Sequence, residues 1–339
     1  MPAKKAPTGT DADLNLATLS ALFVDEEKAR EFFESNRWPN GPVCPHCEST
    51  NVYTLTGKPE SKNPVPPGVY KCAECREKFT ARIGTILEES KLPISKWLMA
   101  FHLMTSSKKG FSSHQMAREL GVTQKTAWFL CHRIRATMTN DPTNGDKLHG
   151  EVEIDESYVG GKPRHANNPG AKPRKASKRG RGTDKAPVMV LVQRDGTSRA
   201  MPVEFVDADT LKAEVRKNVD PSATIITDEW SSYRGLGDEF EGGHHTVNHS
   251  LKEYVRYTDG KDEPEYVSTN TAESWFALLK RSHYGIHHKM SKKHLFRYCV
   301  ERSFVWNHRK VTDGERMVAA IKGGEGKRLM YASPNKQAG

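Results

Sequence analysis

The sequence predicts an α/β protein in which a mixed sheet with helices is preceded by a zinc ribbon and a helix-turn-helix domain. Three observations lead to this prediction: two C-x2-C pairs, a glycine between two capped helical segments, and a succession of strand-like and helical segments after residue 150. We expect a disordered tail, a helix with the ribbon, the helix-turn-helix, a linker, the α/β domain and a flexible tail, at residues 1–13, 14–90, 91–140, 141–150, 151–318 and 319–339.

The composition favours a nucleic-acid partner. A chain of 339 residues is long enough for about two or three domains. Its net charge of +10 indicates a polyanionic partner. The sequence has no apolar run of about 18 residues and no signal-peptide pattern. We therefore expect neither a membrane nor a small-molecule substrate, and we expect a cytoplasmic protein.

The strongest local motif is a set of four cysteines. Two tight turns separated by 24 residues can present four thiolates to one Zn²⁺, and these are Cys44, Cys47, Cys72 and Cys75. Disulfides or a redox motif would use the same residues, but the paired spacing favours zinc. His46 is an alternative ligand, although the cysteines already complete a tetrahedral shell. Because residues 78–87 alternate like a strand, we expect a ribbon held by one structural Zn²⁺.

Three helical segments follow the ribbon. The first covers residues 93–104, the second starts at Ser112 or Ser113 and ends at Gly121, and Thr123 caps the third. The turn glycine would let two helices cross closely, as in a helix-turn-helix, although a three-helix packing module would give the same pattern. In a DNA-binding arrangement, the start of the third helix faces the groove and two later arginines contact phosphates; these residues are Gln124, Lys125 and Thr126, then Arg133 and Arg135.

A basic loop follows the first strand of the α/β domain. In that strand Glu151, Glu153 and Asp155 alternate with apolar residues, which is typical of a half-solvated strand. The loop at residues 160–186 carries nine Lys or Arg against one Asp and has almost no apolar residues. A solvated charge run would look the same, but such a loop could hold a DNA backbone through Lys172, Arg174, Lys175, Lys178 and Arg179.

The order of elements after residue 150 predicts an RNase H-like fold. Three strands are followed by a helix, a strand, a short helix, another strand and a last helix. In that fold an antiparallel hairpin sheet is extended by parallel strands, and the first and fourth strands are neighbours. Asp155 lies in the first strand and Asp228 ends the fourth, so we expect their carboxylates to converge with Glu273 of the last helix.

The last helix, residues 268–282, has two distinct faces. Trp275, Leu278 and Leu279 fall on one stripe, while Asn270, Glu273 and Lys280 lie close together on another because they are three and seven residues apart. A solvated helix with charge pairs would show a similar pattern. The single cysteines, Cys131 and Cys299, lie in apolar helical stretches and predict buried, inert thiols.

Several segments together resemble bacterial insertion-sequence transposases of the zinc-ribbon, ISXO-like group. They are RWPNGPVCPHC, WLMAFHLM, SHQMARELGVTQKTAWFLCHRIR, EIDESYVGGK, TDEW and NTAESWFALLKR, and the resemblance covers residues 20–310. That family has a DDE-type catalytic domain. The resemblance implies that Asp155, Asp228 and Glu273 are the catalytic acids and that Lys280 acts beside them. Members have either asparagine or glutamate at the third position, and this chain offers both Asn270 and Glu273.

The resemblance implies metal-dependent chemistry on double-stranded DNA. Two Mg²⁺ or Mn²⁺ ions held by the three carboxylates would activate the attacking oxygen and stabilise the leaving oxygen. Strand cleavage at the transposon end would free a 3′-hydroxyl, which would then attack target DNA. Pairing of two ends predicts at least a homodimer, acting at the bacterial nucleoid. We expect Glu273 rather than Asn270 as the third metal ligand, because a carboxylate neutralises more of the charge of two cations.

Two other classes of protein have the same modules. A DNA-binding regulator could retain a relic RNase H-like domain, but a missing acid would then be expected, and all three acids are present. A general metal-dependent nuclease would need no pair of DNA-reading modules upstream. The intact acids and both modules therefore favour the transposase.

Overall fold

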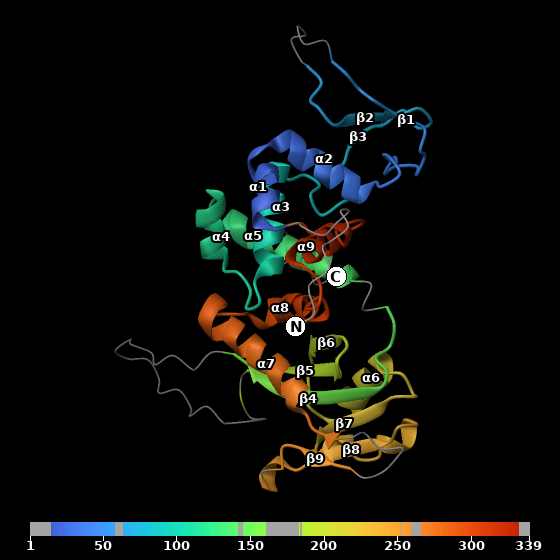
Figure 1. The fold of residues 1–339 in the computed structure, drawn as a ribbon, viewed down its shortest axis with the longest axis vertical. Coiled ribbons are helices and arrows are strands. Elements are labelled where there is room, and N and C mark those ends of the chain that lie inside the picture. Colours follow the sequence, from blue (N-terminus) through green and yellow to red (C-terminus); the bar gives the residue numbers. More distant parts are fainter. Residues whose placement is uncertain are drawn as a thin grey trace, which may run out of the picture. The chain divides into compact units, whose positions relative to one another are not determined.

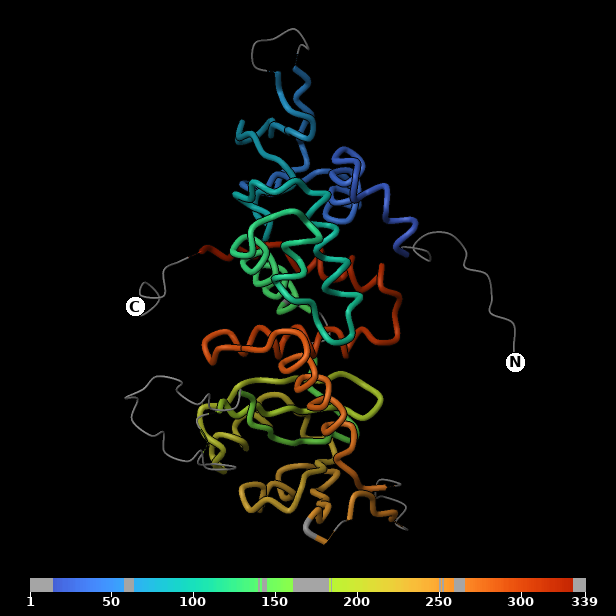
Figure 2. The backbone as a smooth tube through the Cα atoms, turned by 90° about the vertical axis from the view of Figure 1, so that its left-hand side faces the viewer, coloured from blue at the N-terminus to red at the C-terminus, as the bar shows by residue number. Residues whose placement is uncertain are grey.

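The computed structural model describes residues 15–57, 64–141, 145–160, 183, 185–251, 253–258 and 266–331 (Figures 1 and 2). The chain divides into two compact units. The first comprises residues 1–107, 111–141 and 309–339, and the second comprises residues 108–110 and 142–308. The helix-turn-helix and the ribbon, expected as separate domains, therefore lie in one unit. No described helix has the length and apolar character needed to cross a membrane.

Helices make up most of the first unit. They are α1 (Leu16–Val24), α2 (Glu26–Arg37), α3 (Ile94–Ser106), α4 (Ser113–Leu120), α5 (Gln124–Thr137) and α9 (Asp313–Lys322). Side-chain caps set several of their starts: Asp25 accepts two backbone N–H bonds at α2, and Ser112 accepts one at α4. The amphipathic α2 buries Ala29 and Phe33.

The predicted pair of helices around Gly121 is confirmed. Gly121 ends α4 with φ of 60°, a left-handed conformation that suits glycine, and Thr123 caps α5 through the backbone N–H of Thr126. Ala127 and Leu130 are buried and α4 packs against α5. The third expected helix is α3, two residues longer at its end than predicted.

The ribbon is a three-stranded antiparallel sheet in the order β1-β2-β3, comprising β1 (Val52–Thr54), β2 (Val69–Cys72) and β3 (Lys78–Thr80). The strand expected at residues 78–87 is shorter than predicted, because the chain turns after Thr80. Hydrogen bonds from the N–H of Ile83 to the carbonyl of Thr80 and from the N–H of Thr85 to the carbonyl of Arg82 close these turns.

The second unit contains a five-stranded mixed sheet in the order β6-β5-β4-β7-β8. Its strands are β4 (Glu151–Val159), β5 (Ala186–Gln193), β6 (Ser198–Pro202), β7 (Thr224–Asp228) and β8 (His244–Val247). β4 pairs antiparallel with β5 and parallel with β7, so the first and fourth strands are neighbours as predicted. The expected strand at residues 199–206 ends at Pro202, and Phe205 beyond it is exposed.

Helices cover both faces of this sheet (Figure 1). On one face α6 (Ala208–Asn218) packs over β4 through Leu211 and Val215. On the other, α7 (Asn270–Ser282) and α8 (Lys292–Asn307) pack over the alternate residues of β5. The short helix expected between β7 and β8 consists of two 3-10 turns, Ser231–Tyr233 and Gly237–Glu239, and a small hairpin, β9 (Arg256–Tyr257) with β10 (Tyr266–Val267), precedes α7.

The C-terminal boundary differs from the prediction. We expected the α/β domain to run to residue 318 and a flexible tail to follow, but the chain after His308 belongs to the first unit. There α9, which begins with a Thr312–Glu315 capping box, packs against α2, α3 and α5. Arg316 of α9 donates to the carbonyl of Thr105 at 2.9 Å. An amphipathic helix this short is stable because its apolar face is buried, which a sequence window alone cannot show.

Candidate active site and zinc centre

Two strands bring Asp155 and Asp228 together. The parallel register pairs Glu153 of β4 with Ile226 of β7, and each aspartate lies two residues further along its own strand. Each carboxylate is oriented by a local hydrogen bond: Asp155 accepts the N–H of Glu156 at 2.7 Å, and Asp228 accepts that of Trp230 at 3.1 Å. Both side chains are half-buried.

The helix α7 carries the other predicted residues on its exposed face. Asn270, Glu273 and Lys280 are exposed, and the Glu273 side chain retains 50% of its accessible surface. The opposite face is packed in the core through Ala272, Trp275, Phe276 and Leu279. The two predicted faces are therefore present, although Leu278 is only half-buried.

Burial and neighbouring carboxylates raise the pKa of Asp155 from 3.8 to about 6. Loss of solvation is the largest cause, and the negative charges of Asp228 and Glu273 add to it, whereas the N–H of Glu156 and the ammonium of Lys280 lower the pKa. Asp155 thus lies within electrostatic range of residues from β7 and from both ends of α7. Among the described residues the three carboxylates do not form a cluster as tight as that of the cysteines below.

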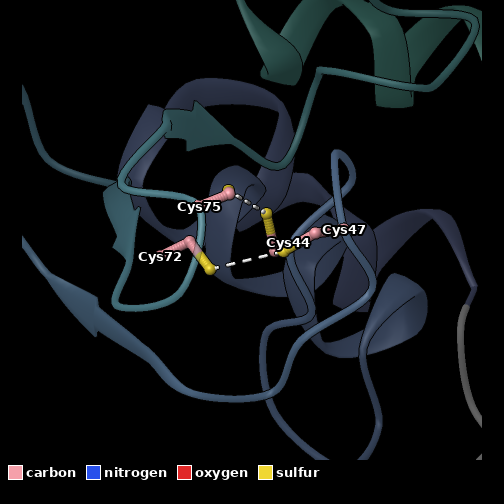
Figure 3. A group of neighbouring side chains, drawn as sticks. All are labelled: Cys44, Cys47, Cys72 and Cys75. Atoms are coloured by element: carbon pink, nitrogen blue, oxygen red, sulfur yellow. Dashed lines mark hydrogen bonds between the residues drawn. The ribbon is translucent and has the colours of Figure 1, made fainter.

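The four cysteines converge as predicted (Figure 3). Their sulfurs all lie within 4.8 Å of one another, with 3.6 Å between Cys44 and Cys75 and 3.6 Å between Cys47 and Cys72. A tetrahedral Zn²⁺ with bonds of about 2.3 Å requires sulfur separations of about 3.8 Å, so this donor set fits zinc. His46 is exposed and is not part of this cluster.

Similar proteins identify the chain. Residues 147–307 match the ISXO2-like transposase domain, and residues 24–78 match the transposase zinc-ribbon domain. A protein in transposable element ISH50 of Halobacterium salinarum, itself uncharacterised, is 31% identical over 266 residues, which cover 76% of this chain and 83% of the relative. The chain belongs to the ISXO2-like transposases. It is a DDE-type DNA transposase with a zinc-ribbon cluster of four cysteines.

Among solved structures, the Mos1 strand transfer complex matches the transposase at 12% identity with a TM-score of 0.25, over 72% of this chain and 82% of that chain. The Drosophila P element transposase strand transfer complex matches at 14% identity with a TM-score of 0.25, over 65% of this chain and 58% of that chain. TM-scores this low support no inference about the details of the site.

The DNA-binding candidates of the transposase have different surroundings. Gln124 and Lys125 are exposed at the start of α5, and Thr126 is half-buried. The Lys125 ammonium lies 4.9 Å from the centre of the Tyr331 ring. The five basic residues expected to hold the DNA backbone, which lie in the loop at 160–186, fall outside the described residues.

The expected phosphate contacts of Arg133 and Arg135 are contradicted by burial. Arg133 is 7% exposed, donates to the carbonyl of Glu88 at 2.7 Å and stacks over Trp97. Arg135 is 2% exposed. Helical spacing placed these guanidiniums on the far part of α5 but could not show which other elements pack against it. Both arginines therefore serve the packing of the transposase rather than its DNA surface.

Two residues near the acids were missed. His249, just after β8, has its Nε2 3.8 Å from a Glu273 carboxylate oxygen and 3.1 Å from Thr269 Oγ1. Glu153 was expected on a half-solvated face but has no exposed surface, and burial raises its pKa although hydrogen bonds from α7 lower it. No local pattern marks either residue, because both acquire their role from contacts with α7 and the residue that precedes it.

Proposed function

We propose that the transposase cleaves and joins DNA at one site formed by Asp155, Asp228 and Glu273, with Lys280 and Asn270 beside them. The observation that carries this proposal is the electrostatic coupling of Asp155 to Asp228, Glu273 and Lys280, which come from β7 and α7. Three carboxylates with one ammonium leave an excess of negative charge at a half-buried position. Such a site favours a divalent cation, because oxygen donors and net negative charge are what Mg²⁺ requires.

The three carboxylates would hold two Mg²⁺ or Mn²⁺ ions. When bound, such ions supply an activated oxygen nucleophile and neutralise charge on the leaving oxygen. Glu273 is the best candidate for the third ligand, since its side chain is half exposed and already within range of Asp155. Asn270 lies one turn earlier on the same exposed face and would assist through its amide.

The protein groups around the carboxylates would position DNA. The Lys280 ammonium, two turns after Glu273, would contact a phosphate next to the scissile bond. Hydrolysis at the transposon end would free a 3′-hydroxyl, and the same residues would then orient that hydroxyl for attack on target DNA. Since two ends must be joined to one target, we propose that the transposase acts as a homodimer or larger assembly on DNA.

Recognition of the transposon ends would come from the first unit. The exposed Gln124 and Lys125, with Thr126, occupy the start of α5, which is the part of a recognition helix that reaches base edges. The zinc would be structural, because four protein thiolates leave no open coordination position.

The test is cleavage of DNA that carries the element's own end. Purified transposase should nick this DNA at a defined position with Mg²⁺ or Mn²⁺ present. The variants Asp155→Asn, Asp228→Asn and Glu273→Gln keep the shape of each side chain and should lower cleavage about 10³-fold or more while DNA binding is retained. The matched control is Glu229→Gln, which removes an exposed charge next to Asp228 and should leave cleavage unchanged.

The variant Asn270→Ala should lower cleavage less than Glu273→Gln does. If cleavage survives Glu273→Gln but is lost in Asn270→Ala, the asparagine is the third ligand. Full cleavage by the variants of all three acids would refute the proposed site.

A further inference from the structure

The start of α7 is held by a side chain from another element. Its own capping residue, Thr269, makes no side-chain hydrogen bond to the helix. Instead, one carboxylate oxygen of Glu153 accepts the N–H of Thr271 at 2.7 Å and that of Ala272 at 3.0 Å. The other oxygen accepts the Thr271 hydroxyl at 2.9 Å. A strand residue thus satisfies N–H groups that have no partner within a helix at its start.

Arg194 completes this arrangement. It follows β5 and lies 3.2–3.3 Å from Glu153 through two of its nitrogens. It also donates to the carbonyls of Tyr266 at 3.1 Å and Ser268 at 3.4 Å, in the segment that leads into α7. It forms a further ion pair with Glu151, and its guanidinium lies 4.2 Å from the centre of the Tyr266 ring. The carboxylate and the guanidinium therefore connect β4 with the entry to α7.

The energetics point to a specific role. Glu153 has no exposed surface, and a buried carboxylate is costly unless charged or dipolar partners surround it. Here the partners are the Arg194 cation and the positive end of the α7 dipole. An apolar residue at position 153 would avoid this cost and still pack against the helix. What it would lose is the directional bond that fixes the position and rotation of the first turn of α7.

The position of Glu153 connects this bond to the acids. Glu153 and Asp155 are two residues apart and therefore lie on the same face of β4. Ala272, whose N–H is held by Glu153, directly precedes Glu273. The residue that fixes α7 and the residue that must meet Glu273 thus share a strand face, and the bond to Ala272 ends one residue before the acid.

We infer that Glu153, supported by Arg194, is a positioning residue that sets the distance of Glu273 from Asp155 and thereby the affinity of the site for divalent cations. This inference rests on the proposed metal site. Displacement of a catalytic group by about 1 Å can lower a rate about 100-fold, so a small shift of α7 would be sufficient to affect cleavage.

The experiment compares Glu153→Gln with Glu151→Gln in the full-length transposase. The amide at position 153 keeps the side-chain shape but presents a donor to partners that are all donors, whereas Glu151 shares the Arg194 partner but pairs with it rather than with α7. Hydrogen exchange is measured on peptides covering the start of α7, and Mn²⁺ binding is followed by electron paramagnetic resonance. Cleavage is titrated with Mg²⁺.

We expect Glu153→Gln to accelerate exchange at the start of α7, to weaken Mn²⁺ binding about tenfold and to lower cleavage about 100-fold at limiting Mg²⁺. Glu151→Gln should change each by less than about threefold. If Glu153→Gln does not fold, Thr271→Val removes a single bond to Glu153 and should shift the same quantities in the same direction by a smaller factor.

Unchanged Mn²⁺ binding in a folded Glu153→Gln variant with accelerated exchange would overturn the inference, because α7 would then move without effect on the site. Unchanged exchange would overturn it as well. Failure of the proposed function gives a different result: wild-type transposase would not cleave its end DNA, while the exchange difference between the variants would persist.

Discussion

The strongest consequence of the crowded carboxylates is that Asp155→Asn should stabilise the transposase in the absence of Mg²⁺. The folded-state pKa of Asp155 is about 6, against an ordinary value of 3.8. The folded protein therefore retains a proton between these values that the unfolded chain loses, so stability falls as pH rises from about 4 to 6. Above about pH 6 the full penalty is present.

The size of the effect follows from the two pKa values. A difference of about two pH units corresponds to about 3 kcal/mol at pH 7, and the same linkage gives only about 0.5 kcal/mol at pH 4. Asparagine keeps the oxygen that accepts the Glu156 N–H but carries no charge. Asp155→Asn should therefore raise the free energy of unfolding by up to about 3 kcal/mol at pH 7 and by very little at pH 4. Lys280→Ala should act in the opposite direction, because this ammonium lowers the pKa of Asp155.

The assay is urea unfolding read by pulsed hydrogen exchange in peptides from β4 and β5, in Mg²⁺-free buffer that leaves zinc bound. This readout reports on the sheet unit separately from the helical unit. Glu229→Gln serves as the control for removal of a nearby exposed charge. An equal gain at pH 4 and pH 7, or no gain at either, would refute the electrostatic explanation.

Other predictions concern the zinc and the DNA contacts. One zinc should be found per chain, and Cys72→Ser should unfold the ribbon while α7 and the sheet stay protected from exchange, since structural zinc contributes directly to folding; folded protein without zinc would contradict this. Replacing Gln124 and Lys125 should reduce preference for the end sequence but retain nonspecific DNA binding, measured by competition, and an unchanged preference would make α5 a packing helix. Neutralising four residues of the basic loop should flatten the salt dependence of DNA binding by about 0.9 for each phosphate that the loop no longer neutralises, and an unchanged slope would exclude the loop; the four are Lys172, Arg174, Lys175 and Lys178.

The sequence by itself determined the features that depend on local spacing. Two C-x2-C turns must each place their thiolates close together, and the sulfurs of Cys44 and Cys75 are indeed 3.6 Å apart. The two faces of α7 follow from helical geometry, which places Glu273 on the exposed side and Trp275 in the core. The order of strands and helices also predicted that β4 and β7 are neighbours, because few topologies satisfy that order.

The tertiary structure alone decided which charged side chains are buried. Glu153 contacts Thr271 across 118 positions of sequence, and Arg133 contacts Glu88 across 45. An alternating strand or a basic helix has the same pattern whether its polar face meets water or another element. The placement of α9 in the first unit has the same origin, since its apolar face could have packed against either unit. Long-range packing selects the partner of each face, and the energy of that selection is not present in any local window of sequence.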